Sequence, residues 1–142
     1  MQQECLRIRR DHGPAPYVFP VERTAAQNRN FRTTVWTGEH LQMTLMCIVP
    51  CGEIGLELHP ETDQYIRIEQ GNAVVKMGRC RQQLDFQRTV SCGDAIFVPA
   101  GTWHKILNTG RGNLIVSSVY APPHHPWGTV HATKEEADRE EE

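Results

Sequence analysis

Short runs of alternating apolar and polar residues follow one another through the middle of this chain, and turn residues end each run. Between residues 31 and 121, runs such as QMTLMCI, QYIRIEQ and NLIVSSVY are separated by glycine, proline, asparagine or aspartate. A period of two places side chains on alternate faces of a β-strand. No stretch of this region has the period of a helix. Short strands at intervals of roughly 8–12 residues favour a sandwich or a barrel, so the central region is predicted to be all-β.

The two ends of the chain differ from this central region. Residues 1–30 contain three prolines between positions 14 and 20, which exclude a helix interior there, so an extended N-terminal arm is predicted. Residues 122–142 begin with proline and histidine and end in an acidic tail. Thr133 and Glu136 have the spacing of a helix cap, which predicts a short, solvated helix in that tail. The barrel itself is predicted over residues 31–121.

Size and charge exclude several classes of partner. The 142 residues suit one domain, and the net charge of -2 gives no basic surface for nucleic acid. No apolar run approaches the roughly 18 residues that a membrane span needs, and the first residues lack a signal-peptide core. We therefore expect a cytoplasmic protein whose partner is a small molecule. Five apolar residues are expected to pack inside the barrel: Met43, Leu45, Phe97, Ile106 and Val116.

Two of the seven histidines, His59 and His104, lie at strand ends with polar company. The other five have loop-like or polar surroundings and are expected at the surface: His12, His40, His124, His125 and His131. His124 and His125 follow the last predicted strand, so an alternative is that they lie over the mouth of the barrel.

The strand GLELH places two chemically useful side chains on one face. Glu57 and His59 are two residues apart, and Gln64 opens the next strand. If this face of the strand were open to solvent, Glu57 and His59 would point into water. If both faces are covered, as in a small barrel, the three side chains converge inside. A metal ion would then offset the cost of burying the carboxylate.

The stretch GDAIFVPAGTWHKILN resembles the second motif of the cupin superfamily at every fixed position. The glycine, proline, glycine, histidine and asparagine of that motif fall on Gly93, Pro99, Gly101, His104 and Asn108. The resemblance implies a double-stranded β-helix, the jelly-roll barrel of the cupins. It also implies that the tight turn before His104 directs this histidine into the interior.

The first cupin motif is present in altered form in CGEIGLELHPETDQYIRIEQG. Glu57 and His59 stand where the motif has its two histidines, and Gln64 stands where it has a glutamate. Cys51 takes the position of the first glycine, and Gly71 matches the last.

The resemblance implies that Glu57, His59, Gln64 and His104 surround one divalent transition metal. Two histidines with one carboxylate are also the ligand set of non-haem iron oxygenases, although Mn, Ni and Zn accept the same donors as Fe. Gln64 is either a ligand or a residue that orients the substrate. The alternative is a metal-free cupin in which Glu57 and His59 pair as acid and base.

Three functions are open at this stage. We expect first a metal-dependent oxidoreductase of the dioxygenase type that acts on a small organic molecule, with Glu57 as its catalytic base. The alternatives are a metal-dependent isomerase or epimerase of a sugar or sugar phosphate, and a non-catalytic cupin that binds a small metabolite. Small cupins often exchange N-terminal strands, so the resemblance also implies a homodimer.

Overall fold

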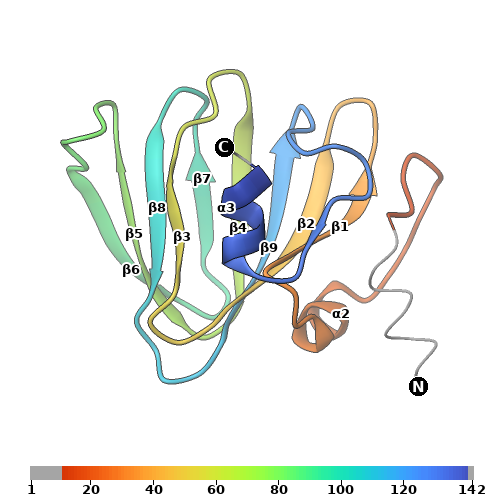
Figure 1. Cartoon of the computed structure of the whole chain (residues 1–142), viewed down its shortest axis with the longest axis horizontal. Helices are drawn as coiled ribbons and strands as arrows, with labels where there is room; N and C mark the ends of the chain where they lie inside the picture. Colours follow the sequence, from red (N-terminus) through yellow and green to blue (C-terminus); the bar gives the residue numbers. More distant parts are fainter. Residues whose placement is uncertain (1–10, 141–142) are drawn as a thin grey trace.

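Two antiparallel sheets face each other in the computed structural model, which describes residues 11–140 (Figure 1). The larger sheet has six strands in the order β10-β1-β2-β9-β4-β7. These strands are β1 (Arg32–Thr37), β2 (Gln42–Ile48), β4 (Asp63–Gln70), β7 (Ala95–Val98), β9 (Leu114–Ala121) and β10 (Val130–His131).

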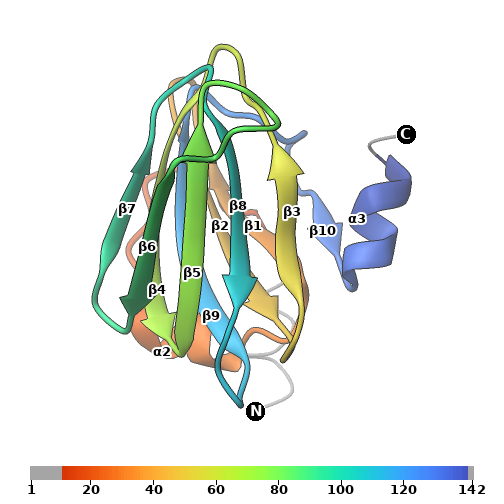
Figure 2. The same cartoon turned by 90° about the vertical axis from the view of Figure 1, so that its left-hand side faces the viewer.

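The smaller sheet has four strands in the order β3-β8-β5-β6. They are β3 (Glu53–Glu57), β5 (Asn72–Gly78), β6 (Phe86–Ser91) and β8 (Trp103–Asn108). The prediction of an all-β, double-stranded β-helix is confirmed. The fold is not the closed barrel that was predicted. Over residues 11–140 every β-ladder joins strands of the same sheet, and no ladder joins the two sheets (Figure 2).

The space between the sheets is divided into an apolar and a polar half. Ile66 and Ile68 of β4, Val116 of β9 and Ile106 of β8 are all fully buried in the main hydrophobic cluster. Farther along the same inner faces the buried side chains are polar. They are also fully buried, and they belong to Gln42, Thr44, Ser118 and His104. The expected packing of Ile106 and Val116 is thus confirmed. A polar chamber continues the core toward one end of the sheets.

A short helix covers the other side of the larger sheet. Helix α2 (Val21–Gln27) buries Ala25 against Leu45 and Ile115, and Met43 packs against this cluster. The N-terminal segment is therefore not extended throughout. Met43 and Leu45 were expected between the sheets, but they pack under α2. Both faces of β2 are covered, one by the second sheet and the other by α2, and alternation in the sequence does not distinguish the two faces. The homodimer expected through this segment stays a prediction.

Phe97 also departs from the expected core, since its side chain lies on the uncovered side of β7. Phe97 is 70% exposed and contacts the ring of Tyr65 on the neighbouring strand, with 5.2 Å between centroids.

The C-terminal segment docks on the molecule instead of extending into solvent. Helix α3 (Lys134–Glu140) begins where its cap was predicted: the Glu136 N–H donates to Thr133 Oγ1 at 3.1 Å. However, Ala137 is only 3% exposed and belongs to the main hydrophobic cluster. Ala137 thus anchors the helix in the core, although its neighbours are acidic. Over residues 11–140, neither helix has the length and hydropathy needed to cross a bilayer.

Candidate metal centre

The turn before β8 carries His104 into the interior. Gly101 has a φ of 78°, in the left-handed region that disfavours residues with a side chain. Its N–H donates to the carbonyl oxygen of His59 at 2.8 Å, so the turn is tied to the segment that holds the other histidine. From there β8 alternates, and His104, Ile106 and Asn108 are buried on its inner face.

A β-bulge in β3 turns Glu57 toward the same interior. Ile54 pairs with Ile106 and Glu57 pairs with His104, so three steps along β3 face two steps along β8. An extra residue reverses the alternation beyond it. Ile54 can therefore pack in the core while Glu57, three residues later, faces the chamber beside His104.

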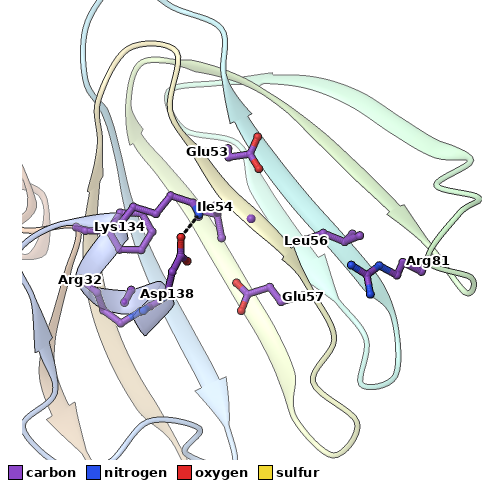
Figure 3. A pocket seen from close by; sticks show the side chains of 11 residues that line it. Arg32, Glu53, Ile54, Leu56, Glu57, Arg81, Lys134 and Asp138 are labelled. Carbon is purple, nitrogen blue, oxygen red and sulfur yellow. Dashed lines mark hydrogen bonds and ion pairs between the residues drawn. The ribbon is translucent and has the colours of Figure 1, made fainter. Parts of the chain in front are cut away.

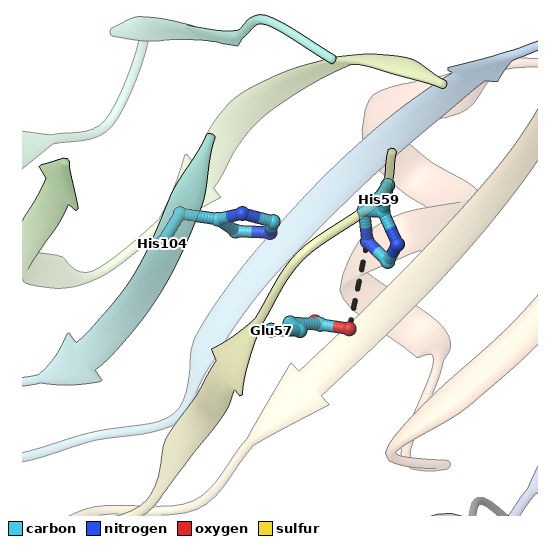
Figure 4. A group of neighbouring side chains, drawn as sticks. All are labelled: Glu57, His59 and His104. Carbon is cyan, nitrogen blue, oxygen red and sulfur yellow. Dashed lines mark ion pairs between the residues drawn. The ribbon is translucent and has the colours of Figure 1, made fainter. Parts of the chain in front are cut away.

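Glu57, His59 and His104 form a compact cluster of metal-binding side chains (Figure 4). One donor atom from each lies within 4.8 Å of the other two. His59 Nε2 is 3.5 Å from Glu57 Oε2, and the centroids of the two imidazole rings are 5.3 Å apart. Ligand atoms held at about 2.0–2.2 Å from one ion lie roughly 3–4 Å apart, so small shifts would bring all three onto a common cation.

The hydrogen bonding of the two histidines fits a metal. His104 Nδ1 lies 3.1 Å from the carbonyl oxygen of Thr102, an acceptor that requires the proton on Nδ1 and leaves the lone pair on Nε2. His104 Nε2 and both ring nitrogens of His59 are buried without a hydrogen-bond partner among the described residues. Each such orphan costs about 1–3 kcal/mol, and a bound cation would satisfy His104 Nε2 and one of the two nitrogens of His59.

Both rings are neutral at neutral pH. Burial lowers the pKa of His59 to about 3, and the charges of His124, His104 and Arg32 act in the same direction. Burial also lowers the pKa of His104, against the opposing effect of its hydrogen bond to Thr102. The contact between His59 and Glu57 is therefore one of a neutral ring with a carboxylate rather than an ion pair. Neutral imidazole is the form that binds metals.

Acid should destabilise the metal-free protein because the folded state holds His59 and His125 as neutral rings. The pKa of His59 falls from 6.5 to about 3, and burial, reinforced by Arg32, lowers that of His125 from 6.5 to about 2. Between these values the unfolded chain binds more protons, so the free energy of unfolding is highest above pH 6.5 and falls as the pH drops. Each ring contributes at most about 1.4 kcal/mol per pH unit, and His104, whose pKa burial also lowers, adds to the slope from His59 and His125.

Urea unfolding in the presence of a chelator, at several pH values below neutrality, measures that slope. The His125→Asn variant should reduce the slope, because one of the three rings with a lowered pKa is gone, and His40→Gln, at an exposed site, should leave it unchanged. A free energy of unfolding that stays level across this pH range would contradict the assignment of neutral, buried rings.

Gln64, the fourth predicted ligand, is buried and has one free acceptor. Its Nε2 donates to Ser118 Oγ at 2.8 Å, while Oε1 is buried without a partner among the described residues. In the sheet Gln64 pairs with Tyr120, whose ring centroid is 5.8 Å from that of His59. Coordination of a metal by Gln64 stays a prediction. Cys51, at the position of the motif's first glycine, keeps a left-handed backbone with a φ of 66°.

His124 lies against the cluster although it is exposed to solvent. Its ring centroid is 4.1 Å from that of His59. The buried side chain of Gln42 holds this segment: Oε1 accepts the backbone N–H groups of His124 and His125, at 3.1 and 2.9 Å, and Nε2 donates to the His125 carbonyl at 2.8 Å. Two positions were expected for His124 and His125, the surface or the mouth of the barrel. The structure places this segment over the chamber. Gln42 itself is a residue that the sequence pattern did not indicate.

His131 contradicts the expectation of a surface residue. It is 2% exposed, because β10 pairs with β1 and brings it onto Arg32. His131 Nδ1 accepts from Arg32 Nη1 at 2.9 Å, and Nε2 donates to Glu140 Oε2 at 2.5 Å. A two-residue strand between prolines and a polar helix leaves no pattern from which this burial could be predicted.

Comparison with known proteins agrees with the motif resemblance. The family model described as a cupin domain matches residues 44–120, which run from β2 to β9 and include all four predicted site residues. The Bacillus subtilis protein YrkC is 53% identical over 128 residues, which cover 90% of this chain and 69% of YrkC. The Acanthamoeba polyphaga mimivirus protein L612 is 35% identical over 115 residues, covering 80% of this chain and 70% of L612.

Among solved structures, BH2720 from Bacillus halodurans superposes with a TM-score of 0.91 at 50% identity, covering 92% of this chain and 98% of BH2720. The agreement in fold therefore extends beyond the segment matched by the family model. This chain belongs to the cupin family.

Proposed function

We propose that this cupin is a metal-dependent enzyme of the dioxygenase type that acts on a small organic molecule. The observation that carries the proposal is the buried cluster of Glu57, His59 and His104, in which His104 Nε2 and the two ring nitrogens of His59 have no hydrogen-bond partner among the described residues. These three residues would hold a divalent Fe, Mn, Ni or Zn ion, with Gln64 Oε1 as a further ligand. Such an ion acts as a Lewis acid and holds a substrate in position for reaction.

The three residues differ in how far a substrate could reach them. His59 and His104 are 4% and 0% exposed, whereas the side chain of Glu57 is 17% exposed. Glu57 also lines a pocket of about 310 Å³ between β3 and α3 (Figure 3). A ligand in that pocket would meet the Glu57 carboxylate before it met either ring. This difference supports Glu57 as the group that would accept a proton from a bound substrate if its carboxylate leaves the metal, with the two histidines as the anchors of the metal.

The reaction class can be tested with an oxygen electrode. Protein loaded anaerobically with iron(II) is mixed with a panel of small hydroxy acids, diols and phenols, and oxygen uptake is followed together with product formation. Oxygen uptake that requires both iron and one of these compounds would support the proposal. Metal-dependent conversion without oxygen uptake would favour the isomerase alternative instead, and a protein that takes up no metal would refute both.

Replacement of Glu57 by glutamine should nearly abolish turnover. The amide keeps the shape of the side chain but cannot accept a proton, and loss of a general base typically costs about 10²–10⁴ in rate. The matched control is Glu53→Gln, which changes a second carboxylate that lines the same pocket. Turnover by the Glu57→Gln variant at the parental rate, with metal bound, would remove Glu57 from the mechanism.

A further inference from the structure

Arg32 is a buried cation without a carboxylate partner among residues 11–140. The residue is 2% exposed, and its Nη1 donates to the ring of His131 at 2.9 Å. Its Nε is buried and has no hydrogen-bond partner within the described part of the chain. Glu140 is reached only through the His131 ring, and its side chain is 63% exposed. A buried charge needs compensation close by, so the surroundings of Arg32 are incomplete as they stand.

Arg32 faces the chamber that holds the metal cluster. It pairs in the sheet with Met46, a residue of the core between the sheets. Arg32 and Glu57 line the same pocket of about 310 Å³ (Figure 3). The charge of Arg32 is also among the causes that lower the pKa of His59. The pocket thus extends from the unpaired guanidinium to the carboxylate of the cluster, and its volume is at the small end for ligand sites.

The other basic residues of this pocket are already engaged. Lys134 donates to Asp138 at 2.8 Å, a contact that Figure 3 shows at the rim formed by α3. Arg81 lies over the ring of Trp103, with 5.6 Å from its guanidinium carbon to the ring centroid, and is exposed to solvent. Among the basic residues of the pocket, Arg32 is therefore the one that combines a positive charge with a buried N–H donor available to a ligand.

We infer that the pocket binds a small 2-hydroxy or 2-oxo carboxylate, whose carboxylate group pairs with Arg32 and whose neighbouring oxygen lies toward Glu57 and the metal site. The inference rests on the proposed function, since the same ligand would reach the metal beside Glu57. Guanidinium and carboxylate form short, charge-assisted hydrogen bonds, often two at once. Such a pair would satisfy the free Nε and compensate the buried charge in a single step.

The test uses glycolate as the probe and glycolamide, its neutral counterpart, as the control. Dissociation constants are measured by calorimetry on metal-free and zinc-loaded protein, and zinc content is measured on the same samples. Parent protein should bind glycolate and not glycolamide. Arg32→Gln should weaken glycolate binding about ten- to a hundredfold, the usual worth of a charge-assisted hydrogen bond, whereas Arg111→Gln, at an exposed position outside the pocket, should bind as the parent does.

The arms of this test separate the inference from the proposed function. If the parent takes no zinc but binds glycolate in a manner that depends on Arg32, the inference stands and the metal-dependent function fails. If zinc binds but Arg32→Gln binds glycolate as tightly as the parent, or the parent binds none, the inference is overturned. Should Arg32→Gln not fold, ¹⁵N NMR of the parent decides: glycolate must shift the Arg32 Nε resonance and glycolamide must not.

Discussion

Replacement of His104 by alanine is expected to remove the bound metal from the purified protein. His104 is fully buried, and the hydrogen bond from its Nδ1 to Thr102 directs Nε2 at the cluster. Alanine leaves two donors of the three, with no side chain near enough on β8 to replace the ring. Elemental mass spectrometry should find about one equivalent of a transition metal in the parent and little in the variant.

The matched control for this experiment is His40→Ala, because the His40 side chain is 86% exposed and lies outside the cluster. Circular dichroism of both variants shows that they fold. Parental metal content in the His104→Ala protein would remove His104 from the ligand set. No metal in the parent, even after anaerobic reconstitution with iron, manganese, nickel and zinc, would mean that the motif serves only the fold.

Asn108→Ala is expected to cause the largest loss of stability among simple polar replacements. Asn108 is 6% exposed, and its Nδ2 donates to the carbonyl oxygens of Ile48, Val49 and Gly112 at 2.9, 3.1 and 3.0 Å. Its Oδ1 accepts the Gly110 N–H at 2.9 Å. Alanine removes all four bonds, of which the one to Ile48 is buried and the other three are partly buried; at about 1 kcal/mol for each bond, the free energy of unfolding should fall by about 3–5 kcal/mol.

Denaturant unfolding of the parent and the variant measures this loss, which is a large part of the 5–15 kcal/mol typical of a whole domain. Asn113→Ala, at an exposed position in the same loop region, should change the free energy of unfolding by less than about 0.5 kcal/mol. A loss as small as that in Asn108→Ala would show that water replaces the side chain, and that the last residue of the motif does not hold the loops together.

The parts of the fold that could be predicted are those with strong local patterns. Alternation located the strands from β1 to β9, and the second cupin motif predicted the turn and buried histidine at Gly101 and His104. The helix cap at Thr133 is also a local device, since both of its partners lie within one turn. In each case the information lies within a few residues of the feature that it determines.

Features that depend on tertiary contacts could not be predicted in this way. Helix α2 has only seven residues, too few to show a helical period, and it forms where Ala25 can pack on the sheet. His131 is buried because its strand pairs with β1, and His124 reaches His59 because Gln42, more than eighty residues earlier in the sequence, binds its backbone. For the site, Glu57 and His59 were predicted to face inward, but the bulge that makes this compatible with a buried Ile54 was not.

The bulge in β3 has a consequence for how this chain and its relatives could diverge. Deletion of one residue between Ile54 and Glu57 would remove the bulge and leave the carboxylate two residues after Ile54, on the same inner face and still opposite His104. A relative could therefore have one residue fewer in this strand and still keep its acidic ligand inside. When sequences of such proteins are aligned, a one-residue gap at this point is compatible with an intact ligand set, whereas a straightened strand of unchanged length would turn the carboxylate outward.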